Sequence, residues 1–533
     1  MKNMKPILIE KIRQTSERGQ AIILVAFAII GLVAIVGLMI DGGMLLIEYA
    51  RLKRGIDAAS IAAASQFRKN FVGADLVKAG EEFLKLNQSD ADVIIYTCSC
   101  PPDEPGCLTS GWHLDDSLCP EPGFSPRKLV RITATRRVEF GFIRIVGIDE
   151  TTITATSVGE AASIDMVLLI DTSASMAYET TVGGNPSQSD AATSTTPGDN
   201  PAYCNDHMGD AARCEPMGEV KDAAEDFVDE LFYPYDRVAL IASTSQTAGG
   251  DRLPTQVPAG VSFMDNYTNA GVENTEIQDA IRGLRVFQPE NCPSLTSLGG
   301  CLGFDSISGL YQGLDCTPLR ETGNPTTCGS SNIGGGLFLA GDQFANARQD
   351  AFWVVIALIG GPANSTNPVN GYPNGLCPGS VGNPTWRWPT GESGYCRYKD
   401  SNPYNILTDR HWATIDDSDP DNPVLVYPAD YDADDYARDG ADYITSPTTG
   451  QYATIFSICM GSYCRNYPSL IDPLSAEHLG QYMALEAGDA PTAIPPVVAN
   501  HGEYYHALTA NDLAGSNGVF AKIAERIFTR ISQ

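Results

Sequence analysis

A carboxylate and two hydroxyl groups recur at alternate positions in the segment Asp171-Thr172-Ser173-Ala174-Ser175. Oxygen atoms of these types are the ligands that Mg²⁺ prefers, and Mg²⁺ keeps waters that an incoming acidic group can replace. The same residues could instead form a turn whose hydroxyl groups cap the next helix. The sequence therefore predicts either a small cation site at Asp171, Ser173 and Ser175 or a capped turn.

A second group of carboxylates lies in residues 400–442, which contain 12 aspartates and no glutamate. Asp430, Asp432 and Asp434 alternate as in an EF-hand Ca²⁺ loop, but Asp435 stands where that loop requires glycine. A Ca²⁺ site and a solvated acidic loop are both consistent with this pattern.

A further acidic segment, residues 178–215, follows the Asp171 loop directly. It could supply an additional carboxylate to a cation there, or it could be a solvated Ser/Thr/Gly loop. Its candidate ligands are Asp190, Asp199, Asp206 and Asp210.

The elements that would position Asp171 follow from the pattern after Ser163. Continuous apolar strands alternate with amphipathic helices, which predicts an α/β fold with a doubly wound, mostly parallel sheet. In such a sheet, loops at the carboxyl ends of the strands form the binding crevice, and Asp171 follows the first strand. We expect this domain to span residues 163–533, with strands near 165–170, 237–243, 351–359 and 453–460 and polar inserts at 178–215, 286–328 and 362–450.

The region between residues 67 and 160 has a different pattern. A helix is predicted near 75–86, followed by strand patterns at 93–97, 129–136, 138–146 and 151–158. This order predicts a small α+β unit.

The first part of the chain is apolar. Residues 21–40 carry no charge and are long enough to cross about 30 Å of hydrocarbon. A helical pattern continues to about Gln66. Residues 1–20 carry a net charge of +3, so the positive-inside rule predicts a cytoplasmic N-terminus and an extracytoplasmic remainder. Arg51, Lys53 and Arg54 on the other side oppose this orientation.

Composition limits the remaining function classes. The chain has 533 residues and a net charge of -30, which disfavours binding to nucleic acid. A hydrophobic content of 43% is sufficient for a folded core. Neither an HExxH sequence nor a nucleophile–base pair is recognisable, so we expect that the protein is not an enzyme; a hydrolase is the remote alternative.

All 14 cysteines lie at or beyond Cys98, and many form close pairs along the chain. Paired cysteines in loop-rich segments indicate disulfides in an oxidising compartment. The predicted pairs are Cys204/Cys214, Cys292/Cys301, Cys316/Cys328, Cys377/Cys396 and Cys459/Cys464. A zinc site is the alternative for Cys98, Cys100, Cys107 and Cys119.

The segment IDMVLLIDTSASM resembles the first strand and metal-ion-dependent adhesion site (MIDAS) of a von Willebrand factor A domain. That resemblance implies a further ligand before a later helix. The segment GSSNIG supplies Ser331 there, with Thr275 as a weaker alternative. It also implies an aspartate after a later strand, but this chain has Gly360. We therefore expect weakened binding of Mg²⁺, or of Mn²⁺ or Ca²⁺, to Asp171, Ser173, Ser175 and Ser331.

The N-terminal stretch RGQAIILVAFAIIGLVAIVGLMIDGG, with RLKRGIDAASIAAAS after it, resembles the membrane helix of TadE/TadG-like proteins of the Tad (Flp) pilus system. The TadG type joins that helix to a von Willebrand A domain. The resemblance implies a single-pass membrane protein of a pilus assembly or adhesion system that binds protein partners of the pilus or envelope. A structural role, with the N-terminal helix packed against other proteins and a metal-free A domain, is the alternative.

Overall fold

The structure is a computed structural model that forms two compact units, residues 1–161 and 162–531. The described residues are 6–66, 72–87, 91–99, 109–120, 126–173, 176, 205, 214–243, 263, 276–286, 303–305, 310–312, 331–363, 366–367, 410–416, 418, 424–428, 431–461, 464, 475–490, 496–515 and 517–531.

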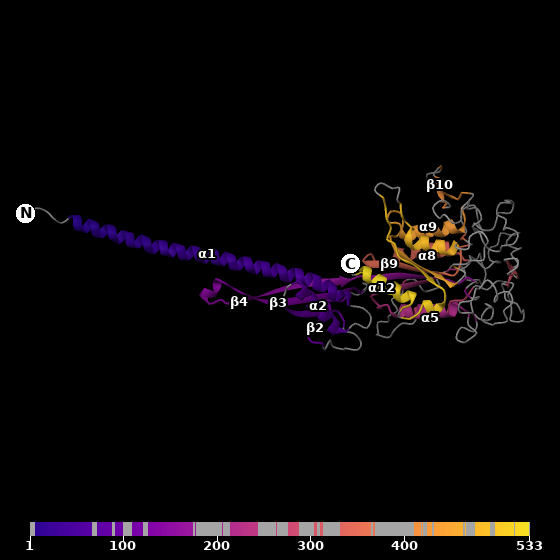
Figure 1. The fold of residues 1–533 in the computed structure, drawn as a ribbon, viewed down its shortest axis with the longest axis horizontal. Helices are drawn as coiled ribbons and strands as arrows, with labels where there is room; N and C mark the ends of the chain where they lie inside the picture. The colour runs from indigo at the N-terminus through magenta and orange to yellow at the C-terminus, as the bar shows by residue number, and fades with distance from the viewer. Residues whose placement is uncertain are drawn as a thin grey trace, which may run out of the picture. The chain divides into compact units, whose positions relative to one another are not determined.

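The first unit begins with the long helix α1, Pro6–Ser65 (Figure 1). Its side chains divide into two groups. Apolar side chains from Ile22 to Ile47 are largely exposed, whereas Leu52, Ile56 and Ala59 near the other end are fully buried. Among the described helices, only the Ala21–Ser65 part of α1 is long and apolar enough to cross a membrane.

The buried end of α1 packs on a four-stranded sheet with the order β2-β1-β3-β4. Helix α2, Gly73–Leu86, also packs against α1. The strands are β1 (Asp92–Thr97), β2 (Trp112–Leu114), β3 (Lys128–Glu139) and β4 (Glu150–Ala161), and a 3₁₀ turn, η1, covers Asp116–Leu118.

The predicted strand at 138–146 is wrong. Strand β3 ends at Glu139, and Ile143–Val146 form a 3₁₀ turn, η2, at the tip of the β3–β4 hairpin. The backbone N–H groups of Gly141, Phe142 and Ile143 donate to the Asp41 carboxylate of α1, so they do not extend the strand ladder.

The second unit contains a five-stranded sheet with the order β13-β12-β9-β5-β6. Every pairing in this sheet is parallel. Its strands are β5 (Ser163–Asp171), β6 (Arg237–Ser243), β9 (Ala351–Ile359), β12 (Thr454–Met460) and β13 (Tyr504–Ala507). The parallel sheet confirms the predicted α/β class.

Helices cover both faces of this sheet (Figure 1). Met166, Leu168 and Ile170 of β5 belong to one core, and Val167 and Leu169 belong to the other. The first core includes α5 (Met217–Asp229), α6 (Glu276–Arg282) and α12 (Val519–Ile531). The second includes α8 (Ile333–Gln343), α9 (Ala433–Thr445) and α11 (Ser475–Leu485).

Helix α9 lies within residues 362–450, for which the sequence predicts a polar insert. It is a core helix instead, because Ala433, Ala437 and Ala441 are fully buried against the sheet. The remaining described elements are short: β7 (Gly303–Asp305), β8 (Leu310–Gln312), η6 (Phe344–Asn346), β10 (Thr414–Asp416), β11 (Val424–Val426) and η8 (Ala510–Asp512).

Candidate functional site

The strand order places a topological switch point between β5 and β9. After β5 the chain continues to β6 on one side, and it later returns to β9 on the other side of β5. Ligands of open parallel sheets bind in the crevice outside the carboxyl ends of the strands at such a point. Asp171 ends β5, and Gly360 directly follows β9, so both lie at this crevice.

Asp171 is fully buried and receives hydrogen bonds from its own loop and from two segments that are distant in sequence. One carboxylate oxygen accepts the Ser173 N–H at 2.9 Å. The other accepts the Ser331 hydroxyl at 3.0 Å and the Gly360 N–H at 3.0 Å. The structure therefore brings together three of the predicted site residues, Asp171, Ser173 and Ser331, and Gly360 joins them through its backbone.

Ser331 is positioned by the beginning of α8. The next residue, Asn332, is the N-cap, and its side chain accepts the Gly335 N–H at 2.9 Å. The Asn332 carbonyl accepts the Ser243 hydroxyl at 2.7 Å, which links the start of α8 to the end of β6. The amino-terminal end of a helix favours negative charge nearby, so α8 helps to accommodate the Asp171 carboxylate.

Glycines allow α8 to lie close to the sheet and to its neighbour α9. A Cβ atom at Gly336 would lie 2.7 Å from a Leu169 methyl group, and one at Gly334 would lie 2.9 Å from the Ala437 backbone nitrogen. Because real Cβ atoms do not approach this closely, side chains at these positions would push α8 away from the site.

Gly360 replaces the aspartate that the family resemblance implies. Its N–H donates to Asp171, and a Cβ atom there would lie 2.7 Å from the Met176 sulfur and 3.5 Å from the nearer Asp171 oxygen. Met176 is buried, so a side chain at residue 360 requires Met176 to shift. The sequence identifies the missing acid but not the N–H group that takes its place.

Burial raises the pKa of Asp171, and hydrogen bonds from Gly360 and Ser173 oppose this effect only in part. The three donors described above are neutral, so they solvate the carboxylate without cancelling its charge. A divalent cation would favour the ionised form. The donor set of one carboxylate and two hydroxyl groups fits a hard cation that also binds water.

The described residues contain no group of three or more histidine, cysteine or acidic side chains placed to hold a metal. The Asp171 site thus offers a cation a single described carboxylate. Two predicted ligands, Ser175 and Thr275, lie outside the described residues. The same is true of Asp190, Asp199, Asp206 and Asp210 in the predicted acidic insert.

The second predicted cation site contains aspartates with other partners. Asp432 caps α9 by accepting the Asp434 N–H at 2.9 Å, and Asp434 pairs with Arg438 at 2.6 Å. The Arg410 side chain is buried near Asp435, at 3.5 Å. These contacts give Asp432 and Asp434 structural roles that require no Ca²⁺, and Asp430 lies outside the described residues.

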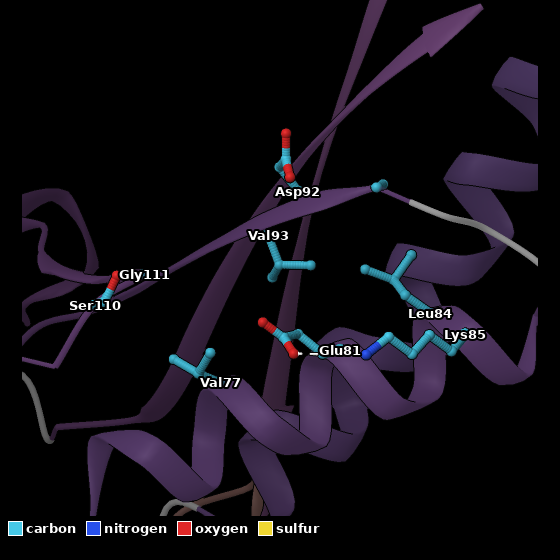
Figure 2. Close-up of a pocket in the computed structure, with 9 residues that line it drawn as sticks. Val77, Glu81, Leu84, Lys85, Asp92, Val93, Ser110 and Gly111 are labelled. Carbon is cyan, nitrogen blue, oxygen red and sulfur yellow. Dashed lines mark ion pairs between the residues drawn. The ribbon is translucent and has the colours of Figure 1, made fainter.

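A pocket of about 270 Å³ lies in the first unit between α2 and the start of β1 (Figure 2). Val77 and Val93 are among its apolar lining residues, and Glu81 pairs with Lys85 at 3.9 Å. None of the predicted site residues lines this pocket.

Two disulfides lie within the described part of the chain, Cys98–Cys119 and Cys459–Cys464. The second confirms a predicted pair. The first excludes the zinc alternative for Cys98 and Cys119, since a disulfide sulfur is not a thiolate ligand. Cys214 is also disulfide-bonded, and its predicted partner, Cys204, lies outside the described residues.

Comparison with known proteins gives one family match. Residues 19–66 match the family described as putative Flp pilus-assembly TadE/G-like, which confirms the resemblance stated for the N-terminal helix. The match connects this segment with pilus-assembly proteins. No curated protein matches the chain.

Several solved structures share a weak overall likeness with the chain. The vWF domain of the type V pili tip protein Mfa5 from Porphyromonas gingivalis is 15% identical, with coverage of 70% of this chain and 97% of that one and a TM-score of 0.32. The pilus adhesin RrgA from Streptococcus pneumoniae is 11% identical, with 75% and 47% coverage and a TM-score of 0.33. Because these scores are low, we transfer no property of those proteins to this chain.

Proposed function

We propose that this chain is a membrane-anchored, extracytoplasmic protein of a Tad-like pilus system, and that its parallel-sheet unit binds a protein partner across a divalent cation at Asp171. The observation that carries the binding proposal is the buried Asp171 carboxylate, which meets the Ser173 backbone, the Ser331 hydroxyl and the Gly360 N–H at the sheet's switch point. The role is binding rather than catalysis.

The candidate cation is Mg²⁺, with Mn²⁺ or Ca²⁺ as alternatives. Asp171, Ser173 and Ser331 would hold it, together with Ser175 from the same loop. When bound, the cation offers a coordination position to an acidic side chain of the partner. Because this chain contributes few carboxylates, the partner's carboxylate would add charge that the site lacks. Cation and partner should then strengthen each other's binding to the same extent.

Three observations support the membrane anchor and its compartment. Residues 19–66 match a pilus-assembly family, and the apolar side chains of α1 from Ile22 to Ile47 are largely exposed. The cysteines at 98, 119, 459 and 464 are paired as disulfides, which persist in oxidising compartments. The positive-inside rule keeps the basic residues before Ala21 in the cytoplasm. Residues beyond about 66 would then lie outside the cytoplasm.

The orientation is tested by adding protease to spheroplasts. We expect degradation of the chain beyond about residue 66, because that part lies outside the cytoplasmic membrane. Protection of this part, with degradation only after the membrane is opened, would reverse the proposed orientation.

Partner binding is tested by capture from a detergent extract of the envelope, using the full chain as bait. We expect a protein that is retained with Mg²⁺ and released by a chelator. Asp171→Ala should lose it, whereas Asp416→Ala, which removes an exposed carboxylate, should retain it. A partner that is unaffected by chelator and by Asp171→Ala would support the alternative of a structural pilus component with a metal-free domain.

A further inference from the structure

The tip of the β3–β4 hairpin, residues 140–149, carries exposed apolar side chains. Ile145 is 86% exposed, Ile148 is 52% exposed and Phe142 is 42% exposed. Hairpin turns in water are usually built from Gly, Asn, Asp, Ser and Pro. Three large apolar side chains at one tip indicate that it contacts a nonaqueous surface.

The tip is fixed to α1 through Asp41. The Asp41 carboxylate accepts the N–H of Gly141 at 2.9 Å, that of Phe142 at 2.9 Å and that of Ile143 at 2.6 Å. One helical turn earlier, Gly37 faces Phe142: a Cβ atom at residue 37 would lie 2.7 Å from the Phe142 Cβ. The hairpin tip therefore lies beside the apolar part of α1, as Figure 1 shows.

Because the hairpin tip covers Asp41, the exposed apolar surface of α1 extends beyond this residue. Asp41 is the only charged residue between Ala21 and Ile47, and it is 1% exposed because the tip covers it. Residues on either side are apolar and exposed, including Met39 at 71% and Leu46 at 70%. The sequence places the end of the span at Ile40, but the exposed apolar surface continues to Ile47, roughly 40 Å along the helix from Ala21.

Ion pairs mark the polar boundary beyond this surface. Glu48 pairs with Arg136 at 2.8 Å and with Arg51 at 3.0 Å. On the hairpin, Arg137 pairs with Glu150 at 3.5 Å and Arg144 pairs with Asp149 at 3.3 Å, and both pairs are exposed to solvent. Arginines with long apolar stems can extend their charged ends to lipid phosphates while the stems stay in the apolar layer.

We propose that residues 140–149 are embedded in the interfacial layer of the membrane that α1 spans, and that Asp41 fixes the tip at that depth. The lipid bilayer is the favoured occupant because the tip is continuous with the exposed apolar surface of α1. Backbone N–H groups satisfy the Asp41 carboxylate, as is required of a charge close to lipid. This proposal rests on the membrane anchor in the proposed function.

The test is photo-crosslinking of the full chain in vesicles of neutral and anionic phospholipids. A benzophenone amino acid is placed at Ile145 at the tip, at Leu32 in α1, or at Leu114 in β2, which is 48% exposed in the same unit. We expect lipid adducts at Ile145 and Leu32, and at least roughly tenfold fewer at Leu114, since transfer of an isoleucine-sized side chain from water to an apolar layer is favoured by at least about that factor.

The two proposals fail in different ways. Adducts at Leu32 with none above the Leu114 level at Ile145 would overturn the embedded hairpin and leave the anchor intact. No adducts at Leu32 would overturn the anchor itself. Adducts from Ile145 to protein instead of lipid would assign the tip to a protein partner and contradict this proposal.

The role of Asp41 is tested with the same probes. Asp41→Ala removes the acceptor of three N–H groups, so lipid adducts at Ile145 should fall several-fold while those at Leu32 remain. Asp41→Asn keeps one acceptor oxygen and should give an intermediate yield. Unchanged adducts at Ile145 in Asp41→Ala would show that Asp41 does not fix the tip.

Discussion

Strand β5 holds a fully buried aspartate at each end. The aspartate at the start has charged partners, whereas the one at the end has only neutral hydrogen-bond donors among the residues described around it. Asp165, at the start, pairs with Arg237 at 2.5 Å and with Arg348 at 2.6 Å. Asp171, at the end, accepts hydrogen bonds from Ser331 and from the Gly360 backbone, which are neutral.

The same contrast appears in the acidity of the two groups. Burial alone would raise the pKa of Asp165, but hydrogen bonds from Arg237 and Arg348 bring it below its ordinary value. Burial raises the pKa of Asp171, and its donors compensate only in part. Asp165 has its counter-charges within the protein and therefore stabilises the fold. Asp171 has neutral donors at the switch point of the sheet, so its charge is suited to binding an external cation.

The largest effect expected from this comparison concerns stability. Asp165→Ala leaves two arginines partly buried without their shared partner and should lower the free energy of unfolding by about 3–5 kcal/mol. Asp171→Ala removes an incompletely compensated charge and should cost much less in the absence of divalent cations. Thermal unfolding of both full-length variants in detergent with chelator checks this. An equal loss of stability in the two variants would contradict the proposed difference between the two ends of β5.

The pH dependence of stability should differ in sign between the two residues. With a lowered folded pKa, Asp165 stabilises the fold above its ordinary value of 3.8, and this stability is lost as the pH falls through the folded pKa. With a raised folded pKa, the stability linked to Asp171 is present below 3.8 and is lost as the pH rises through the folded pKa.

The measurement is urea unfolding across the acidic range with chelator present. Asp171→Asn should remove the loss of stability on raising the pH, an effect of about 1.4 kcal/mol for each pH unit between the folded and unfolded pKa values. Mg²⁺ should reduce the same loss in wild type, because a bound cation favours the ionised carboxylate. A wild-type profile identical to that of Asp171→Asn would contradict the assignment.

A smaller effect is expected at Gly360. Gly360→Asp adds the acid that the family resemblance implies and should tighten cation binding by about tenfold, or about 1.4 kcal/mol. Gly360→Ala is the matched control, because it brings the same Cβ atom towards Met176 without charge. Calorimetric titration with Mg²⁺ compares them. If both variants bind equally, charge at residue 360 does not limit the site.

Much of this comparison could be predicted from the sequence, but not all of it. The apolar run of β5 predicts a buried parallel strand, and its position predicts that Asp171 lies at the crevice. The meeting of Asp171 and Ser331, 160 residues apart in sequence, follows from the family resemblance and not from spacing. The Gly360 N–H leaves no signal in the sequence, because every residue except proline carries that group.

The sequence pattern does not predict helix α9, and the reason is physical. Its buried face consists of small residues such as Ala433, Ala437 and Ala441, and its many aspartates are typical of a solvated loop. Asp434 is accommodated by Arg438 within the helix, and Asp439 by Arg410 from 29 residues earlier. Such pairing is visible only once the chain is folded. The sequence pattern at 138–146 predicts a strand, but the N–H groups of the hairpin tip bind the Asp41 carboxylate instead of a neighbouring strand.

The central claim is that Asp171 holds a divalent cation, and calorimetric titration of the full chain with Mg²⁺ tests it most directly. We predict weak heat of binding to a single site in wild type and in Asp416→Ala, and its disappearance in Asp171→Ala. The same binding heat in Asp171→Ala as in wild type would show that the cation binds elsewhere and would contradict this assignment of the site.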